Sequence, residues 1–592
     1  MLEVRGIELD AALLDGWRAR VERARRHLGW HRPPLALPVP REIVVRRHAA
    51  GASLAIEAPF DQLFTATEVN EWALCAGLHE RDPGHWSGLP DAMLALARED
   101  AADPDKVIAP VLEERAAMAR FERLARAEIR NDIRELINAA ESLGVRHILD
   151  ETTFTLGAGA GGLSWPLNDL PTVEEVRWGS VHEIPVAVVT GSNGKTTTVR
   201  LIAACLRAQG LRDGYSCTDG VYVDREQLEA GDYSGPAGTR CVLRDRRVEA
   251  AVLETARGGI LRRGLAIDHA NVAVVTNVAS DHFGEYGIHD LAGLADAKLT
   301  VAQLVPRDGL LVLNADDPML LAKATGLAAR LGFEPPIGWF AVDFDHPRLA
   351  AHRAAGGSTC GVRDGRLRLT HGTAEHDLGD INDMPLTIRG AARYNIANLA
   401  GAALAATALG AGPTVLAHVC ASFGEQPADN AGRLMRFDVG GVTAIVDYAH
   451  NPDGLRAVLQ VARALRGPGG RFAMLLGHAG NRRDADYEDV ASVAADFAPD
   501  LIVVKEDEQH MRGRSPGEVP ALLRAALLRS GVDASSIAMQ PGEVAAADYA
   551  LSWARPGDVV ALLMHASSAR AEVLARMSGA QGAQSSPASP AG

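Results

Sequence analysis

The residue types best suited to chemistry stand at positions 190–198, which read Thr-Gly-Ser-Asn-Gly-Lys-Thr-Thr-Thr. This stretch follows an apolar run typical of a buried strand, 184–189, and precedes a segment with helical spacing of apolar residues, 199–209. A glycine turn between strand and helix offers backbone N–H groups to phosphate, and a lysine and a hydroxyl can serve phosphate and Mg²⁺. We interpret the stretch as an ATP-binding phosphate loop. The residues expected to bind nucleotide are Gly191, Ser192, Asn193, Gly194, Lys195, Thr196 and Thr197.

The general phosphate-loop pattern is matched only in its second half, because Val189 stands where that pattern has glycine. A chance Gly-Lys-Thr at the start of a helix is therefore an alternative interpretation. The agreement of the flanking strand and helix favours the phosphate loop.

Two polar residues follow other predicted strands. Glu254 ends the apolar run 250–254, and His282 lies shortly after the run 272–276. Open α/β sheets bind ligands at the carboxyl ends of their strands. We therefore expect Glu254 to reach the Mg²⁺ that Thr196 touches, and His282 to contact metal or phosphate. A solvated strand-end carboxylate and a structural histidine are the respective alternatives.

Composition narrows the class of protein. The 592 residues are 47% hydrophobic and 23% charged, as in ordinary globular proteins, and their number predicts roughly three to four domains. A net charge of −15 argues against a nucleic-acid partner. The six cysteines are scattered without a C-x-x-C pair, which indicates reduced thiols. No apolar run approaches the length of a membrane span, and the first residues do not resemble a secretion signal. We expect a cytoplasmic protein without membrane contact.

The periodicity of apolar residues divides the chain into segments. In the first part it predicts helices over 11–28, 92–98 and 109–142 and a hairpin between 42 and 58. Later, short apolar strands alternate with helices, which predicts parallel sheets covered on both faces and an α/β fold. We expect an N-terminal α+β accessory domain (1–165), a linker (166–183), a central P-loop α/β domain (184–428), a C-terminal Rossmann-like α/β domain (429–576) and a disordered tail (577–592).

A second glycine-rich stretch, Gly157–Gly162, matches the dinucleotide pattern G-x-G-x-x-G. Its context differs from that pattern, because Leu163–Pro166 follows where a helix should begin. We expect a surface loop or a linker, with a ligand-contacting loop as the alternative.

Several dispersed motifs, in order and with similar spacing, resemble the Mur ligase superfamily. They are Thr190–Thr197, Glu254, Asn277–His282, Asn314–Asp317, Tyr394–Asn398, Gly432-Arg433 and Asp447–Pro452. Three further stretches, 253–262, 505–508 and 512–518, are similar to the Mur-like domain of cyanophycin synthetases. The resemblance covers roughly residues 180 to 575, and the central and C-terminal domains are expected to have the fold of that superfamily.

The resemblance implies an ATP- and Mg²⁺-dependent amide ligase. A substrate carboxylate would take the γ-phosphate of ATP, and an amine would displace phosphate from the acyl phosphate to form an amide. The implied catalytic and metal-binding residues are Lys195 at the β- and γ-phosphates, Thr196 and Glu254 at one Mg²⁺, and His282 at a second, with Lys298 nearby. Lys298 aligns with a lysine that many members carry as a carbamate, and a solvated lysine is the alternative. The implied nucleotide contacts are Asn314 and Asn395 at adenine, and Arg433 and Asp447 at phosphate and ribose.

One departure concerns domain content. Cyanophycin synthetases place a long ATP-grasp domain before the Mur-like part, and the roughly thirty residues between Glu151 and Ile184 are too few for one. We therefore expect a single kind of ligation. The resemblance implies amino-acid or short-peptide substrates, with aspartate- and arginine-containing ones among the candidates. The acidic run Glu506, Asp507 and Glu508 either attracts a cationic amino acid or forms a solvated turn.

Two other functions stay open. The chain could ligate a peptidoglycan precursor or a polyglutamate, or it could bind nucleotide as a non-catalytic partner of a full synthetase. The intact set of charged site residues argues against the non-catalytic alternative. A homo-oligomeric state and the role of residues 1–165 are also left open.

Overall fold

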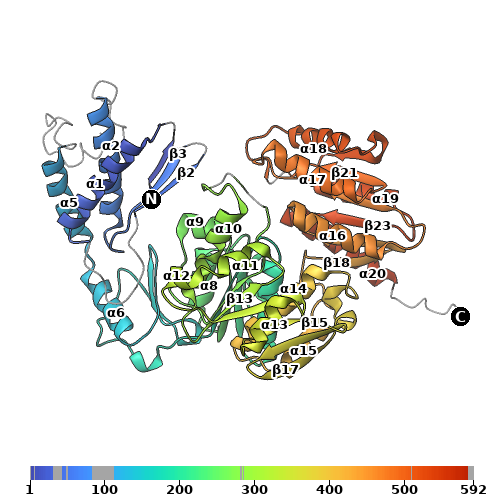
Figure 1. Cartoon of the computed structure of the whole chain (residues 1–592), viewed down its shortest axis with the longest axis horizontal. Coiled ribbons are helices and arrows are strands. Elements are labelled where there is room, and N and C mark those ends of the chain that lie inside the picture. Colours follow the sequence, from blue (N-terminus) through green and yellow to red (C-terminus); the bar gives the residue numbers. More distant parts are fainter. Residues whose placement is uncertain are drawn as a thin grey trace. The chain divides into compact units, whose positions relative to one another are not determined.

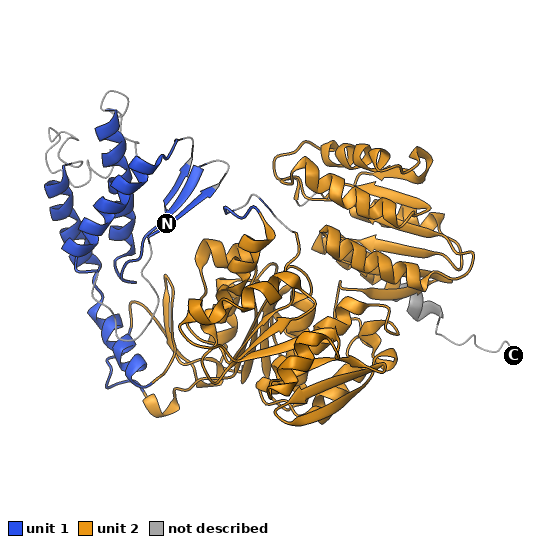
Figure 2. Ribbon diagram, in the orientation of Figure 1, with its two compact units in different colours: residues 1–143, 170–176, 283–289 blue, residues 144–169, 177–282, 290–592 orange. Residues whose placement is uncertain are grey.

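The computed structural model describes residues 2–5, 7–30, 43–48, 51–82, 113–280, 283, 286–507 and 510–584. The chain divides into two compact units (Figure 2). The first contains residues 1–143, 170–176 and 283–289, and the second contains residues 144–169, 177–282 and 290–592. The helix predicted over 92–98 lies outside the described residues, as do His282 and Glu508.

The first unit combines a small antiparallel sheet with helices, as predicted for an α+β domain. Its sheet has the order β1-β3-β2, and the predicted hairpin is present as the antiparallel pair β2 and β3. The elements of the first unit are β1 (Leu2–Arg5), α1 (Ala11–His27), β2 (Val44–His48), β3 (Gly51–Ala55), α2 (Leu63–Arg81), α5 (Glu114–Glu128) and α6 (Asn131–Ser142).

The long helix predicted over 109–142 is divided into α5 and α6. The backbone is extended at Ile129, and the Asp61 side chain accepts a hydrogen bond from the Arg130 N–H at 3.0 Å. Asp61 also binds the Arg134 guanidinium at 2.7 and 2.8 Å. A side-chain acceptor at the start of α6 satisfies a donor that has no partner within the helix. This tertiary contact accounts for the break that helical periodicity alone does not show.

The glycine-rich stretch 157–162 forms a buried turn, so the expectation of a surface loop was wrong. It connects β5 (Thr153–Leu156) to β6 (Leu163–Pro166), which form a three-stranded antiparallel sheet with β4 (His147–Leu149). Gly159 has a φ of +53°, and a Cβ there would lie 2.2 Å from the Val248 carbonyl oxygen. Close backbone approach, not ligand contact, therefore requires glycine at this position.

A charged cluster ties the β4–β6 sheet to the central domain. Arg146, of which the side chain is almost fully buried, binds the Glu183 carboxylate at 3.0 Å and the His269 carbonyl oxygen at 2.9 Å. The His269 ring contacts Asp268 at 2.8 Å and Glu183 at 3.6 Å. These contacts, first with Asp268 and then with Glu183, raise the pKa of His269 to about 9. His269 is therefore held as a cation near neutral pH.

The central domain, in which β13, β15 and β17 are labelled in Figure 1, is built on a sheet of eleven strands. Their order is β10-β9-β8-β11-β7-β12-β13-β14-β15-β16-β17. The seven strands from β8 to β15 in this order pair in parallel, and the outer strands are antiparallel. The strands are β7 (Val186–Thr190), β8 (Asp213–Cys217), β9 (Gly220–Val223), β10 (Glu226–Ala230), β11 (Ala250–Glu254), β12 (Val272–Val275), β13 (Leu310–Asn314), β14 (Ile337–Asp343), β15 (Thr359–Arg363), β16 (Arg366–His371) and β17 (Ala374–Asp380).

Nine α-helices of the described chain belong to this domain. They are α7 (Lys195–Ala208), α8 (Pro236–Arg244), α9 (Arg257–Arg263), α10 (Leu291–Lys298), α11 (Pro318–Ala324), α12 (Leu327–Leu331), α13 (Pro347–Ala354), α14 (Arg393–Ala408) and α15 (Pro413–Ser422). Helices α7 to α13 lie between successive strands of the sheet, and α14 and α15 follow its last strand, β17. Helices α7, α14 and α15 share one apolar core with the sheet. All five residues of β7 are buried, which explains why this strand has a continuous apolar sequence rather than an alternating one.

The register of the sheet brings the predicted site residues to one edge. Glu254 pairs with Val189, and Val275 pairs with Thr190, so β11, β7 and β12 end at the same level. Each strand continues directly into a polar segment. The phosphate loop, Glu254 and the residues after β12 therefore meet at the carboxyl edge, as an open α/β sheet requires.

The C-terminal domain is a six-stranded sheet in the order β18-β19-β23-β20-β21-β22, parallel except for β18. Helices α16, α17 and α18 pack on one apolar core and α19 and α20 on another. The elements are β18 (Met435–Val439), β19 (Val442–Asp447), α16 (Pro452–Leu465), β20 (Phe472–Leu476), α17 (Asp484–Asp496), β21 (Leu501–Lys505), α18 (Glu518–Arg529), β22 (Ile537–Gln540), α19 (Glu543–Trp553), β23 (Val559–Leu563) and α20 (Ser567–Gln584).

Helix α20 continues through Gln584, beyond residue 577, where we expected disorder to begin. Val573 and Met577 are buried, and they anchor the helix to the sheet. The residues after 584 lie outside the described chain, and the boundaries between the predicted domains stay predictions.

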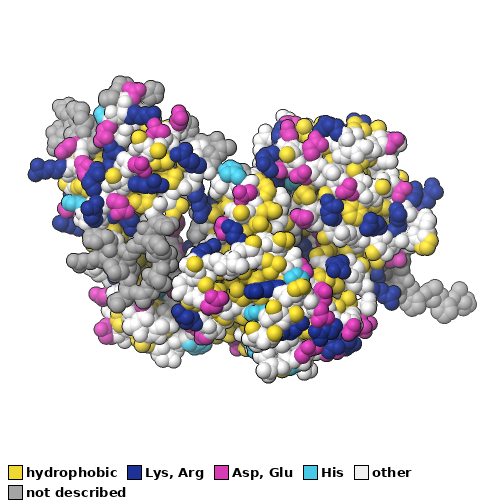
Figure 3. Space-filling view, in the orientation of Figure 1, with side chains coloured by type: hydrophobic (Ala, Val, Ile, Leu, Met, Phe, Trp, Pro, Cys, Tyr) yellow, Lys and Arg dark blue, Asp and Glu magenta, His cyan; other side chains and the backbone are white. Residues whose placement is uncertain are grey.

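The surface is mixed in charge. On the face seen in Figure 3, acidic and basic side chains are interspersed. Within the described ranges, none of the helices combines the length and apolar character needed to cross a bilayer.

Candidate active site

Two glycines shape the loop between β7 and α7. Gly191 has a φ of +147°, and a Cβ there would lie 1.9 Å from the Thr276 hydroxyl oxygen. Gly194, the N-cap of α7, has a φ of +83°, and its Cβ would lie 2.2 Å from the Asn398 side-chain oxygen. Both positions combine left-handed backbone with close neighbours, so any side chain would displace the loop. The loop begins a fourteen-residue helix, whose first N–H groups have no acceptor within the helix.

The loop is held by the segment that follows β12. The Asn193 N–H donates to the Asn277 side-chain oxygen at 2.9 Å, and the Asn277 amide group donates back to the Asn193 carbonyl at 3.0 Å. The Ser192 hydroxyl donates to the Ala279 carbonyl at 3.0 Å. The Lys195 ammonium group donates to the Ser192 carbonyl at 3.0 Å, so the lysine folds back over its own loop. A loop fixed at this many points is preorganised for an anion.

Glu254 lies at the end of β11 with a fully buried side chain and accepts two hydroxyl hydrogen bonds. The Thr196 hydroxyl donates to one of its oxygens at 2.8 Å, and the Thr218 hydroxyl donates to the other at 2.8 Å. The predicted proximity of Thr196 and Glu254 is therefore observed. The solvated strand-end carboxylate, our alternative for Glu254, was wrong. Thr218 was not identified from the sequence, because it follows β8 and carries no motif of its own.

The donor set at this point suits Mg²⁺. A threonine hydroxyl and a carboxylate are both hard oxygen ligands, and Mg²⁺ takes few protein ligands when phosphate oxygens and waters supply the rest. Within the part of the chain that the structure describes, no cluster of three or more His, Cys, Asp or Glu side chains could hold a metal. The Thr196–Glu254 pair fits a metal whose other ligands are phosphate oxygens and waters.

A cavity of about 380 Å³ opens at this edge and is lined from both sheets. Most of the predicted nucleotide-binding residues line it: Ser192, Asn193, Gly194, Lys195, Thr196, Thr197, Asn314, Asn395, Arg433 and Asp447, together with Glu254. Lys298 is not among the lining residues; it is buried at the end of α10 rather than solvated. His282, the second predicted metal ligand, lies outside the described residues.

Asparagines form the side of the cavity that we assigned to adenine. The Asn395 amide group donates to the Leu386 carbonyl at 3.0 Å, and its oxygen accepts from Asn398 at 3.0 Å. The Asn314 amide group donates to the Thr276 carbonyl at 2.9 Å. These bonds orient the amides, which carry both donors and acceptors and can recognise a base edge. Tyr394 also lines this cavity.

The C-terminal domain contributes Arg433 and Asp447. The Asp447 carboxylate accepts hydrogen bonds from the Leu434 and Ala449 N–H groups, each at 2.7 Å. Burial raises the pKa of Asp447, although the Arg433 charge opposes this effect. The Arg433 guanidinium lies 4.4 Å from the centre of the Tyr448 ring, a cation–π arrangement.

The amides of Asn193 and Asn451 join the two domains directly. The Asn451 amide group donates to the Asn193 side-chain oxygen at 2.9 Å, and the Asn193 amide group donates back at 3.3 Å. Asn451 is also the N-cap of α16. The phosphate loop of one sheet is thus bonded to the first turn of a helix on the other.

The acidic run after β21 is not a solvated turn in its described part. Glu506 and Asp507 are buried, and Glu506 accepts the Gly517 N–H at 2.6 Å. Asp507 binds the His510 ring at 3.0 Å and lies 3.7 Å from His565. Burial alone would raise the pKa of Asp507, but these histidines outweigh it and hold the pKa well below its usual range.

Comparison with known proteins agrees with this geometry. Residues 189–406 match the Mur ligase middle domain, and residues 432–563 match the Mur ligase glutamate ligase domain. A cyanophycin synthetase of Synechocystis is 38% identical over 357 residues, which are 60% of this chain and 40% of that protein. A UDP-N-acetylmuramoyl-L-alanyl-D-glutamate–2,6-diaminopimelate ligase of Chlorobium phaeobacteroides is 27% identical over 330 residues, 54% of this chain and 60% of that protein.

Among solved structures, the chain is similar to E. coli FolC in complex with DHPP and ADP. The TM-score is 0.48 and the identity 18%, over 67% of this chain and 89% of that chain.

The chain spans about two fifths of the length of the cyanophycin synthetase that it matches. The two matched parts contain most of both sheets and all of the residues that line the cavity except Asn430. Through its middle and C-terminal domains, the chain belongs to the Mur ligase family.

Proposed function

We propose that the chain is an ATP- and Mg²⁺-dependent amide ligase that joins an amino acid to a carboxylate through an acyl phosphate. The observation that carries this proposal is the convergence on one cavity of a phosphate loop, the Thr196–Glu254 pair and Arg433 from the facing domain. Membership of the ligase family supports the reaction type. The names of the curated relatives, cyanophycin synthetase and a diaminopimelate ligase, support amino-acid or peptide substrates.

The side chains would divide the work of phosphoryl transfer. ATP supplies the phosphoryl group that activates the carboxylate, and Mg²⁺ neutralises charge on it. The N–H groups of the phosphate loop and the Lys195 ammonium group would hold the phosphates. Thr196 and Glu254 would orient the metal, and Arg433 would add a positive charge where negative charge develops. Asn314 and Asn395 would hold the base, and Asp447 the ribose.

Closure of the cavity by the second domain would serve the later step. An activated carboxylate is lost if water reaches it before the amine does. The Asn193–Asn451 bonds keep the two walls of the cavity together. We therefore propose that the carboxylate and the amine meet in the space between the two domains.

Product formation tests the proposal. Release of ADP and phosphate should require both a carboxylate and an amine, and mass spectrometry should find the amide. Candidate substrates are free amino acids and aspartyl-arginine peptides, with cell-wall precursors and glutamate as the competing classes. The Lys195→Ala variant should fold but lose turnover. Nucleotide binding without turnover for any acid and amine pair would favour the non-catalytic alternative.

His282 and Lys298 keep their predicted roles as proposals. His282→Ala should raise the Mg²⁺ concentration needed for half-maximal turnover, and an unaltered Mg²⁺ titration would remove it from the metal site. A carbamate on Lys298 would give a ¹³C signal after exposure to labelled bicarbonate. That signal should be absent from Lys298→Arg.

A further inference from the structure

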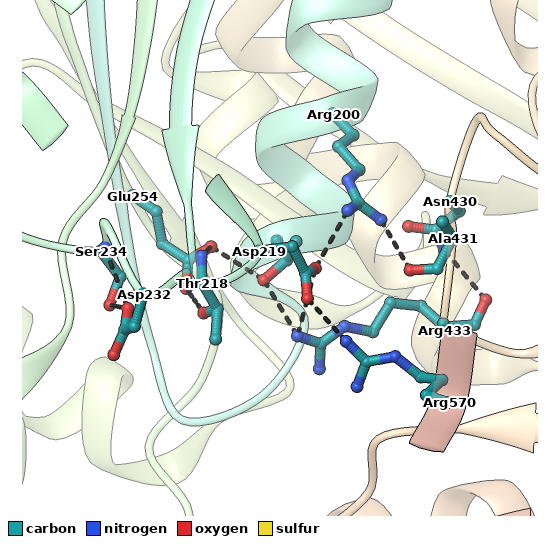
Figure 4. A network of polar contacts seen from close by, with 12 residues as sticks. Arg200, Thr218, Asp219, Asp232, Ser234, Glu254, Asn430, Ala431, Arg433 and Arg570 are labelled. Carbon is teal, nitrogen blue, oxygen red and sulfur yellow. Dashed lines mark hydrogen bonds and ion pairs between the residues drawn. The ribbon is translucent and has the colours of Figure 1, made fainter. Parts of the chain in front are cut away.

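A single carboxylate next to the cavity is bound to three arginines. The Asp219 oxygens lie 3.0 Å from Arg200, 2.9 Å from Arg570 and 3.8 Å from Arg433. Figure 4 shows the three guanidinium groups turned toward Asp219 from different elements. Among the described side chains, no second carboxylate forms an ion pair with any of these arginines. Asp219 is therefore their shared counter-ion.

The three arginines come from parts of the chain that meet only in the folded state. Arg200 lies on α7, the helix that begins at the phosphate loop, and Arg570 lies on α20 of the C-terminal domain. Arg433 belongs to the segment that enters the C-terminal sheet just before β18. Arg200 also donates to the Ala431 carbonyl at 3.0 Å, which fixes that segment two residues before Arg433. Asp219, in the turn between β8 and β9, is the point that these elements share.

Burial makes this counter-ion important. The exposed fractions of the side chains are 5% for Arg200, 10% for Arg570 and 15% for Asp219. Like charges in a poorly hydrated site repel strongly unless a carboxylate lies between them. The three arginine charges also hold the pKa of Asp219 below its usual value, against the effect of burial. Removing the carboxylate charge would therefore push the guanidinium groups apart.

Arg433 is the member of this cluster that reaches the cavity. Its guanidinium lies 3.5 Å from the Thr196 hydroxyl and stacks on the Tyr448 ring. The nitrogen that faces Thr196 is the same Nη2 that faces Asp219. Arg200 and Arg570 do not line the cavity. The position of Asp219 thus decides where the Arg433 charge stands relative to the phosphate loop.

We infer that Asp219 is a positioning residue for ligation: it holds Arg433 at the phosphate loop and, through Arg570, ties this placement to closure of the C-terminal domain. The inference rests on the proposed ligase function and adds to it a residue outside the motifs. Asp219 acts through Arg433 and needs no contact with substrate.

The inference predicts that replacing Asp219 slows turnover but hardly changes the binding of ATP. Most of the groups that are proposed to hold the nucleotide, those of the phosphate loop among them, belong to the central domain. ATP binding should therefore depend little on Asp219. The Arg433 charge should matter most when negative charge moves during phosphoryl transfer. For Asp219→Asn, we expect kcat to fall about tenfold to a hundredfold while KM for ATP changes less than about threefold.

The experiment compares three variants of the full-length chain. Asp219→Asn removes the charge, and Asp219→Glu restores it and should regain at least part of the lost kcat. Asp224→Asn is the matched control, because Asp224 follows the same strand pair, is 55% exposed and lies 3.8 Å from Arg207. This control should keep wild-type kcat and KM. The stoichiometry of ADP binding gives the fraction of active protein, so that a folding defect is not mistaken for a slower reaction.

The outcomes separate this inference from the function on which it rests. A wild-type chain without turnover for any acid and amine would overturn both. An active wild type with an equally active Asp219→Asn variant would overturn the positioning role alone. The same conclusion would follow if Asp219→Asn and Asp219→Glu lost the same share of kcat per active site. If Asp219→Asn does not fold, Arg570→Gln takes its place, because Arg570 lies outside the cavity and should show the same loss of kcat.

Discussion

Replacing Thr218 by valine tests how the Glu254 carboxylate is held. The substitution preserves the shape of the side chain and removes the hydroxyl that donates to Glu254 at 2.8 Å. Glu254 is fully buried, so water does not easily replace this donor. A hydrogen bond to a charged group contributes about 1.5–3 kcal/mol. Since about 1.4 kcal/mol corresponds to a factor of ten, Mg²⁺-dependent binding of ADP should weaken by about tenfold to 150-fold.

This range agrees with the general effect of groups that orient metal ligands, about tenfold to a hundredfold in affinity. The assay is calorimetric titration of ADP, with Mg²⁺ and with EDTA, into the wild type and the variant. The loss should appear with Mg²⁺ and be small with EDTA. Thr218→Ser keeps the hydroxyl and should restore most of the affinity.

The reasoning fails if Thr218→Val binds ADP equally well with Mg²⁺. It also fails if the loss is the same with EDTA, because Thr218 would then support the loop and not the metal ligand. A Thr218→Ser variant as weak as the valine variant would show that side-chain size, and not the hydroxyl, matters.

Three further predictions concern stability. Lys505→Met leaves the buried Glu543 carboxylate without the cation that it binds, and should lower the free energy of unfolding by about 3–5 kcal/mol. An unchanged urea midpoint would contradict this. His269 has a pKa raised to about 9, chiefly by Asp268, against roughly 6.5 when unfolded. The stabilisation of the folded state by His269 should therefore be complete below pH 6.5 and lost as pH rises through 9. The free energy of unfolding of the wild type and of His269→Gln, compared across this pH range, measures it. Gly159→Ala places a Cβ 2.2 Å from a backbone carbonyl and should lower the melting temperature, whereas Gly179→Ala, with open space around it, should not.

The strands around the site were predictable because each is locally distinctive. The expected run 250–254 coincides with β11, the run 272–276 covers β12, and the helical segment 199–209 lies within α7 except for its last residue. Strands buried on both faces are continuously apolar, and helices on such sheets have one apolar side. Both patterns can therefore be recognised from residues that are close together in the sequence. The sequence missed the buried glycine turn at 157–162, because the carbonyl that crowds it comes from Val248.

Some residues of the candidate site could be predicted from the sequence, and others could not. Lys195, Thr196 and Glu254 were found from the sequence, because a glycine turn before a helix and an acid at a strand end carry their chemistry in local order. Thr218, Asp219 and Arg570 could not be found, since no motif marks them and their partners lie far away in the chain.

The sequence by itself determined that a phosphate loop begins a helix after a buried strand, and that a carboxylate ends another strand of the same kind. Only the tertiary structure decided that β11 and β7 are neighbours in register, so that Glu254 meets Thr196. It also decided that α20, at the far end of the chain, brings Arg570 to Asp219. The physical reason is that local order sets which groups a segment can offer, whereas hydrogen-bond register and core packing set which segments meet.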